Sequence, residues 1–481
     1  MTKQGLKDKT VKGTFWSALD NIANYAVGFV ISIILARLLS PDDYGLIGII
    51  AIFTTICNTI INAGFSNALI RKTDASDEDY NTVFFINLCL SVLLYVLLFA
   101  AAPLISKFFN RAELVNLVRV STLTMIIGAL ALVQQTRLTK RIDFKTQTKI
   151  SLISHITSGV IGIAMAFSGY GVWALVGQSL SSQTLKTVFL WIYNKWLPQI
   201  SFSYKSFKEL WGFGSKLLIS NVIDSVWREV YRIVIGKCYT PAVLGQYTRA
   251  NQFSEIFSIN LTLVIQRVTY PVLSEIQEEE DRLKIAYRKI IKVTMLVTFS
   301  CMLMLAAISR PLIIVLIGEK WLMAADILPI ICFQGMLYPL HSLNLNMLQV
   351  KGRSDLFLKL EIIKKSIAIV PLILGVFWGI YPMLISSVIV GLISYYLNAY
   401  YSGPLLGYSI MAQIKDWLPD FLIALFASLV AYGISFVPLS PFVVLPIQII
   451  TGLLIIYVLC LLFKIEEFFE IKNIVSRYIK R

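Results

Sequence analysis

Charged residues, histidines and paired cysteines are all scarce in this chain of 481 residues. Only 15% of its residues are charged, whereas soluble globular chains carry about 25%. A further 57% are hydrophobic, which excludes an ordinary soluble domain. Alternating segments of about ten residues, typical of membrane β-barrels, are also missing. The sequence therefore predicts an integral membrane protein built from helices.

Patterns typical of catalysis or metal binding are missing as well. The two histidines, His155 and His341, lie in apolar runs without neighbouring ligand residues, which favours hydrogen-bonded core positions. The six cysteines are scattered without paired spacing and are expected to be small core residues. The stretch Gly212–Lys216 does not have the spacing of a Walker A motif. We therefore expect no enzyme, no cofactor and no metal site.

Long apolar runs fill most of the chain. A bilayer core needs roughly 20 apolar residues per helix, and the sequence offers about fourteen such runs between short polar loops. The predicted spans are 14–38, 45–70, 81–105, 114–135, 148–168, 171–193, 212–238, 245–270, 290–317, 323–348, 358–378, 380–402, 419–437 and 441–463.

A proline followed four positions later by a glycine occurs twice, at Pro41–Gly45 and Pro241–Gly245. Each copy lies between two apolar runs and fits a tight turn between helices. Weaker matches in the same order support a duplication, and an even number of spans in each half gives both halves one orientation. The predicted fold is an all-α membrane protein with two six-helix lobes related by a parallel repeat, two further helices, and a cavity between the lobes. The predicted parts are an N-lobe over 1–193, a cytoplasmic linker over 194–210, a C-lobe over 211–402, and two extra spans with a tail over 403–481.

Basic residues cluster in alternate loops and give the chain its net charge of +15. The positive-inside rule explains this pattern better than nucleic-acid binding and predicts that both termini are cytoplasmic. In the tail from Lys464 to Arg481, acidic and apolar residues alternate irregularly. Either an amphipathic helix on the membrane surface or a solvated helix fits this tail.

Ionisable residues inside the predicted spans mark the candidate site, because each costs roughly 2.5–3.5 kcal/mol at the centre of a membrane helix. Asp224, Arg228 and Arg232 recur every four residues, share one helical face and adjoin Asn221. On the next span, Glu255 lies level with the two arginines and Arg249 lies nearer the outer end.

The arrangement of these charges has two interpretations. In the first, Arg228, Arg232 and Arg249 hold a diphosphate group, because the planar guanidinium binds phosphate oxygens bidentately. Asp224 and Glu255 are then candidates for ion coupling. In the second, the same charges form buried ion pairs that lock two spans together, with Glu229 as a further partner.

Other polar residues inside the spans are weaker candidates. Polar residues in the first two spans either line a cavity or bond helix to helix. Lys364 and Lys365 either face the cavity or extend to the membrane surface, and the latter is favoured for Lys186. The residues of the first two spans in question are Asp20, an ion-coupling candidate, Asn21, Asn24, Asn58 and Asn62.

Two stretches carry a family resemblance. The segment LARLLSPDDYGLIGI from Leu35, and the pattern of Trp196, Pro198 and Lys208–Gly214, resemble the polysaccharide-transporter branch of the multidrug/oligosaccharidyl-lipid/polysaccharide (MOP) exporter superfamily. Wzx-type flippases are its best-known members. The resemblance implies a two-lobed bundle that moves an undecaprenyl-diphosphate-linked oligosaccharide from the inner to the outer leaflet by alternating access. It also implies a bacterial inner-membrane protein of O-antigen, capsule or exopolysaccharide biosynthesis.

Three other functions are alternatives to this one. A flippase for a peptidoglycan lipid precursor fits the same physics, whereas a cation-coupled drug antiporter favours carboxylates over arginines in its cavity. A membrane glycosyltransferase or polymerase needs a sizeable outward loop, and no predicted loop is that long. The expected partners are the lipid-linked oligosaccharide, membrane lipids, H⁺ or Na⁺ as a coupling ion, and other membrane proteins of polysaccharide assembly.

Overall fold

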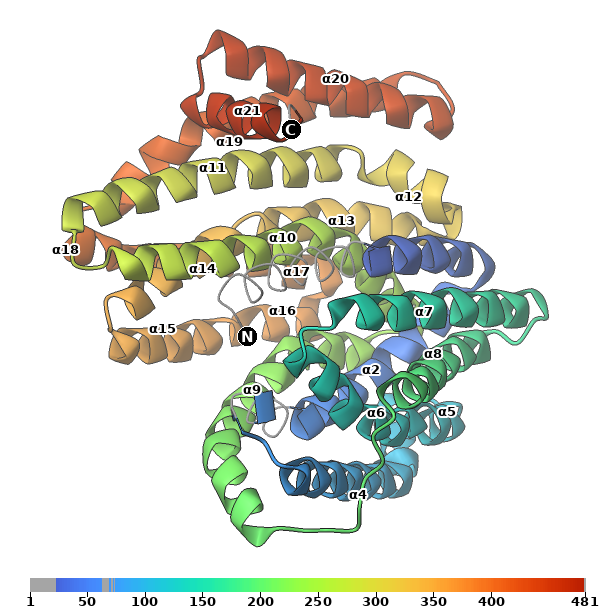
Figure 1. The fold of residues 1–481 in the computed structure, drawn as a ribbon. Coiled ribbons are helices and arrows are strands. Elements are labelled where there is room, and N and C mark those ends of the chain that lie inside the picture. Colours follow the sequence, from blue (N-terminus) through green and yellow to red (C-terminus); the bar gives the residue numbers. More distant parts are fainter. Residues whose placement is uncertain (1–22, 63–68, 71, 73, 480–481) are drawn as a thin grey trace. The chain divides into compact units, whose positions relative to one another are not determined.

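The structure, a computed structural model, describes residues 23–62, 69–70, 72 and 74–479 (Figure 1). The chain divides into two compact units, residues 1–245 and 246–481. All the regular elements of the described residues are helices. The predicted all-α fold class is therefore confirmed.

The first unit contains the helices that surround the candidate site. Its helices are Ala23–Leu38, α2 (Pro41–Asn62), α4 (Asp77–Phe109), α5 (Leu114–Ser121), α6 (Leu123–Lys140), α7 (Phe144–Phe167), α8 (Val172–Asn194) and α9 (Tyr204–Cys238). Of the predicted linker 194–210, only residues 195–203 are non-helical, because α9 begins at Tyr204.

The second unit begins inside α10 (Pro241–Glu275) and is again built of helices. Several of its spans are broken into two consecutive helices. Its remaining elements are α11 (Glu280–Ala307), α12 (Ser309–Ile317), the 3₁₀ turn η1 (Glu319–Trp321), α13 (Leu322–Gly335), α14 (Tyr338–Val350), α15 (Ser354–Ile367), α16 (Ile369–Trp378), α17 (Ile380–Tyr400), α18 (Ser402–Leu406), α19 (Ile410–Gly433), the 3₁₀ turn η2 (Ile434–Phe436), α20 (Pro441–Leu462) and α21 (Glu466–Ile479).

Nine helical stretches among the described residues are long and apolar enough to cross a membrane. The protein is therefore a multi-pass membrane protein. With 23, 35 and 35 residues, α8, α9 and α10 are also long enough, but they are more polar and are not among the nine. The count of fourteen spans stays a prediction.

The start of α2 explains the first copy of the repeated Pro-to-Gly motif. The Ser40 backbone nitrogen donates to Asp43 Oδ2 at 2.9 Å, and the Asp43 nitrogen donates to Ser40 Oγ at 3.2 Å. These reciprocal bonds form a capping box, and Pro41 occupies the first helical position, where a proline is tolerated. Gly45 thus lies one turn inside α2. The turn between the two helices therefore ends before Pro41, whereas the motif predicts that it extends to Gly45.

Close packing accounts for both glycines of the repeat. A Cβ atom on Gly45 would lie 1.8 Å from the carbonyl oxygen of Pro241, and one on Gly245 would lie 2.0 Å from that of Pro41. The two copies of the motif therefore pack against each other, and only glycine permits this approach.

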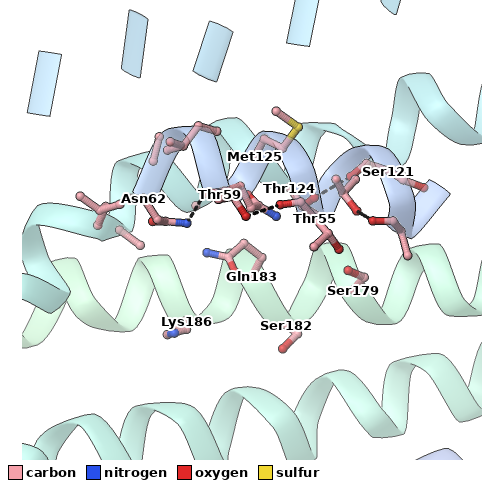
Figure 2. A pocket seen from close by; sticks show the side chains of 18 of the residues that line it. Thr55, Thr59, Asn62, Ser121, Thr124, Met125, Ser179, Ser182, Gln183 and Lys186 are labelled. Atoms are coloured by element: carbon pink, nitrogen blue, oxygen red, sulfur yellow. Dashed lines mark hydrogen bonds between the residues drawn. The ribbon is translucent and has the colours of Figure 1, made fainter. Parts of the chain in front are cut away.

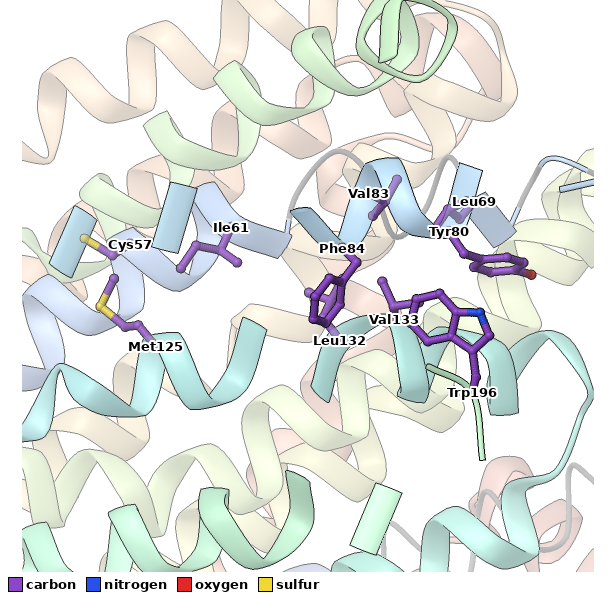
Figure 3. Close-up of a cluster of buried hydrophobic side chains, with 10 residues drawn as sticks. All are labelled: Cys57, Ile61, Leu69, Tyr80, Val83, Phe84, Met125, Leu132, Val133 and Trp196. Atoms are coloured by element: carbon purple, nitrogen blue, oxygen red, sulfur yellow. The ribbon is translucent and has the colours of Figure 1, made fainter. Parts of the chain in front are cut away.

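Aromatic side chains hold the linker on the first unit (Figure 3). Trp196 is buried and makes edge contacts with Tyr80 and Phe84 of α4, at 6.4 and 6.0 Å between ring centroids. The Gln134 amide of α6 donates to the Trp196 carbonyl oxygen at 2.8 Å. The linker is thus fixed against the beginning of α4 and the end of α6.

A buried polar network crosses the second unit. The Oδ1 atom of Asn344 on α14 accepts hydrogen bonds from Tyr287 Oη at 3.0 Å, Ser402 Oγ at 2.9 Å and Gln413 Nε2 at 3.1 Å. These partners lie on α11, α18 and α19, and all four side chains are buried. One amide oxygen therefore joins four helices.

We expect Asn344→Leu to destabilise the protein by about 2 kcal/mol or more, because an unsatisfied buried polar group costs roughly 1–3 kcal/mol and three donors lose their acceptor. Thermal unfolding in detergent measures this effect. Asn346→Leu is the matched control, since the buried side-chain nitrogen of Asn346 has no hydrogen-bond partner among the described residues. Equal losses of thermal stability in the two variants would contradict the role of Asn344 as a shared hydrogen-bond acceptor.

The C-terminal helix α21 packs against the second unit. Glu470 forms a 2.6 Å ion pair with Lys289 of α11, and Glu467 forms another with Lys292. The Phe468 ring meets Tyr457 of α20 at 5.5 Å between centroids. Phe468 and Ile471 of this tail are thus packed against the hydrophobic core of the second unit.

Candidate functional site

A cavity of about 1210 Å³ lies within the first unit. Most of its walls come from α2, α6 and α8, whereas α7 and α9 add two described residues each and α5 adds only Ser121. Figure 2 shows Thr55, Thr59 and Asn62 on one helix, with Ser179 and Gln183 opposite. Among the described residues, neither the helix Ala23–Leu38 nor α10 lines it. The predicted cavity between the lobes stays a prediction.

Hydroxyl and amide groups belong to 16 of the 31 described residues that line the cavity. On α2, Thr55, Asn58, Thr59 and Asn62 recur every three or four residues and therefore share one helical face. The Thr59 and Ser225 hydroxyl oxygens lie 2.7 Å apart and connect α2 to α9. Such neutral donors and acceptors suit the hydroxyl groups of a sugar.

The charged side chains that line the cavity are cationic. Arg228 of α9 and Lys186 of α8 are lining residues, together with His155 of α7 and Asn221 of α9. No aspartate or glutamate lines the cavity among the residues that the structure describes. The Arg228 side chain is exposed and has no hydrogen-bond or ion-pair partner within the described part of the chain. Its guanidinium is therefore available to an anionic ligand.

Arg232, the neighbour of Arg228 on the predicted face, is held by a carboxylate. Its Nη1 atom donates to both carboxylate oxygens of Glu229, at 3.1 and 3.0 Å. Glu229 is buried, and its charge therefore needs this partner. Asp224 lies one turn before Arg228 on the same helix and is exposed.

Arg249 and Glu255 lie on α10 in the second unit. Arg249 is buried, its Nη1 donates to Gln252 Oε1 at 2.5 Å, and its guanidinium carbon lies 5.8 Å from the centre of the Trp321 ring. Glu255 Oε1 accepts a 2.6 Å bond from Asn251.

The remaining predicted residues lie elsewhere. Asn24 donates to Ser151 Oγ of α7 at 2.9 Å and so bonds helix to helix. Lys364 forms a 2.5 Å ion pair with Glu361 within α15, which also carries Lys365. Asp20 lies outside the described residues.

Sequence reasoning missed several cavity residues. Lys186 was expected to extend to the membrane surface and His155 to lie in the core, yet both line the cavity. Hydroxyl residues of α6 and α8, such as Thr136 and Ser182, were not considered. Polar residues recur every three or four positions on α8 from Gln178 to Lys186, and this pattern was the available signal of a polar helix face.

No metal centre accompanies the cavity in the described part of the chain. No group of three or more histidine, cysteine, aspartate or glutamate side chains there is placed to hold an ion.

The arrangement of helices resembles that of known membrane transporters. The lipid II flippase MurJ in an inward closed conformation superposes with a TM-score of 0.74, over 93% of this chain and 98% of that one, at 16% identity. An inward-facing multidrug resistance MATE family transporter of the MOP superfamily gives 0.62, over 79% and 95%, also at 16% identity. The chain thus shares the helical fold of these two proteins.

Sequence comparison identifies the family. The profile of the polysaccharide biosynthesis protein family matches residues 34–326, and the chain belongs to that family. The teichuronic acid biosynthesis protein TuaB of Bacillus subtilis is 28% identical over 349 residues, 72% of each chain. The lipopolysaccharide biosynthesis protein WzxC of Escherichia coli is 24% identical over 442 residues, 90% of this chain and 89% of that one. The resemblance seen in the sequence is confirmed.

Proposed function

We propose that the protein is a flippase that moves an undecaprenyl-diphosphate-linked oligosaccharide across the bacterial inner membrane by alternating access, with both termini in the cytoplasm. The observation that carries this proposal is the exposed Arg228 in a large cavity lined by hydroxyl and amide groups, without a lining carboxylate among the described residues. A diphosphate fits the guanidinium, and sugar hydroxyls fit the walls.

Cavity size and charge separate this function from its alternatives. Pockets for small molecules enclose about 300–1,000 Å³, and the cavity here, at 1210 Å³, exceeds that range. A drug antiporter for cations needs acidic lining residues, whereas this lining carries arginine, lysine and histidine. A peptidoglycan-precursor flippase shares the fold, but the names of the sequence relatives favour the export of another polysaccharide precursor.

Each predicted site residue has a place in this proposal. Arg228 and Asn221 line the cavity and form the proposed diphosphate subsite. Asn24 and Arg249 stay predictions for substrate binding, as do Lys364 and Lys365. The bonds from Arg232 to the buried Glu229 instead favour the ion-pair interpretation for Arg232. Asp224, Glu255 and Asp20 stay predictions for coupling to H⁺ or Na⁺. Further membrane proteins of polysaccharide assembly remain the expected partners.

Deletion of the gene tests the proposal. We expect a lipid-linked oligosaccharide to accumulate on the inner leaflet and to disappear when the gene is restored on a plasmid. Extraction of the lipid fraction and mass spectrometry identify the glycan. Accumulation of a peptidoglycan precursor would favour the alternative flippase, and accumulation of no lipid-linked sugar would contradict transport of this class.

A further inference from the structure

The linker between α8 and α9 presents an apolar surface away from the protein. We define the linker strip as Leu197, Ile200, Phe202 and Tyr204, all at least 60% exposed, with Ile200 98% exposed. Exposed side chains of this size are unusual in a connecting segment of a folded protein, unless another apolar phase covers them.

The opposite side of the linker is fixed to the first unit by alternate residues. The Gln199 nitrogen donates to Asn81 Oδ1 at 3.0 Å, and Asn81 Nδ2 donates to Ser201 Oγ at 2.9 Å. The Ser203 nitrogen donates to Thr82 Oγ1 at 3.1 Å. The Ser201 nitrogen also donates to the Gln199 carbonyl oxygen at 2.7 Å, so the chain turns sharply at Ile200, whose side chain is 98% exposed on the outside of this turn.

The anchoring residues set the depth of the strip in the membrane. α4 has 33 residues and is about 50 Å long, which exceeds a hydrocarbon core of about 30 Å. Asn81 and Thr82 lie within roughly 8 Å of the beginning of α4, which places them at the level of the headgroups. In Figure 1 the linker runs beside this end of α4.

Positive charge surrounds the strip. Lys195, Lys205 and Lys208 are exposed next to it. Behind it, the guanidinium of Arg137 lies 5.0 Å from the Tyr80 ring centre and 5.3 Å from that of Trp196. Apolar side chains flanked by lysines at headgroup level are the combination that binds an anionic lipid surface.

We propose that the linker strip inserts into the anionic lipid surface of the membrane, with its apolar side chains at the boundary of headgroups and acyl chains and its lysines on the headgroups. The strip thereby attaches the beginning of α9, the helix that carries Arg228, to the membrane surface as well as to α4. This inference concerns a surface outside the cavity lining and holds whatever cargo is transported.

Depth-dependent fluorescence quenching tests the proposal. Single cysteines at Ile200, at Leu97 in the apolar part of α4 and at Glu278 in the turn before α11 are introduced into a variant without the native cysteines. Each is labelled with an environment-sensitive fluorophore, and the purified full chain is placed in vesicles of phosphatidylcholine and phosphatidylglycerol. Because Ile200 is almost fully exposed, its replacement removes few contacts within the protein.

We expect lipids brominated near the glycerol end to quench the label at 200 at least about twofold more strongly than the label at 278. Aqueous iodide should instead quench the label at 278 more strongly than the label at 200. The label at 97 should be quenched best by lipids brominated deeper in the chain. Iodide quenching at 200 equal to that at 278 would overturn the proposal. Protection from both quenchers would also overturn it, since it would show that protein covers the strip.

The choice of anionic lipid has its own control. Replacing Lys195, Lys205 and Lys208 together by glutamine should reduce bromolipid quenching at 200 in vesicles that contain phosphatidylglycerol, because each lysine near an anionic surface adds attraction. The same replacement should have little effect in phosphatidylcholine alone. Equal quenching of both proteins in the anionic vesicles would overturn the assignment of anionic lipid as the partner.

Discussion

Replacing Arg228 by alanine is expected to lower export about 10- to 100-fold, because a hydrogen bond to a charged group is worth roughly 1.5–3 kcal/mol. The amount of folded protein should stay unchanged. The Arg228 side chain is exposed and bonds no other described residue, so its removal leaves no buried group without a partner. Restoration of surface polysaccharide in the deletion strain, compared with membrane protein level, measures the two quantities separately.

Arg232 provides a matched comparison on the same helix. Its guanidinium bonds both carboxylate oxygens of the buried Glu229, so Arg232→Ala leaves a buried charge unpaired. We expect this variant to lose folded protein, with export falling in proportion. Arg228→Lys should retain part of the export, since the charge remains but the planar fork is lost.

Two outcomes would contradict the role of Arg228. Normal export by Arg228→Ala would show that this side chain does not hold the cargo. A parallel fall in folded protein and export would assign it a structural role, as expected for Arg232. The cargo site would then have to be sought elsewhere, among Asn221 and the hydroxyl groups of the cavity.

Gly45→Ala is expected to lower the melting temperature strongly, because the added methyl group meets the Pro241 carbonyl oxygen at 1.8 Å. Overpacking costs about 1–3 kcal/mol even where side chains can adjust, and here the contact is with backbone, which cannot change rotamer. The same substitution at Gly245, where a Cβ atom would lie 2.0 Å from the Pro41 carbonyl oxygen, should have a similar effect. Thermal unfolding of the purified protein in detergent measures both.

Gly28→Ala is the matched control for these two substitutions. A Cβ atom on Gly28 would meet nothing within 4 Å. Alanine in a helix is preferred over glycine by roughly 0.5–1 kcal/mol, so this variant should be as stable as the natural protein or more so. A Gly45→Ala protein with an unchanged melting temperature would contradict the close contact between the two motifs.

The fold and part of the site were predictable because their signals are large. Apolar runs of twenty residues and charges inside them are both rare by chance, and Arg228 stood out for that reason. The role of Gly45 was not predictable, since nothing in the sequence reveals that Pro241 lies against it. The repeat itself was visible only as a pattern of spacing.

The hydroxyl lining of the cavity was hidden for a different reason. Serine and threonine in membrane helices commonly bond to the carbonyl oxygen one turn earlier, and such residues carry no sign of a cavity. Thr59 does this with the Thr55 oxygen at 2.9 Å, and Thr136 with the Leu132 oxygen at 2.9 Å, yet all four residues line the cavity. The partner of Arg232 was equally hard to foresee, because two acidic residues, Asp224 and Glu229, precede it on the same helix.

The hydrogen bonds around Asn344 limit how the second unit can deform. Sliding any of α11, α14, α18 or α19 by one turn, about 5.4 Å, would break bonds to a single buried oxygen that water cannot replace. These four helices are therefore expected to move as one rigid block. Bending is easier where a span is already interrupted away from that oxygen, as between α15 and α16 at Ala368. During transport, these four helices would therefore shift together without bending relative to one another.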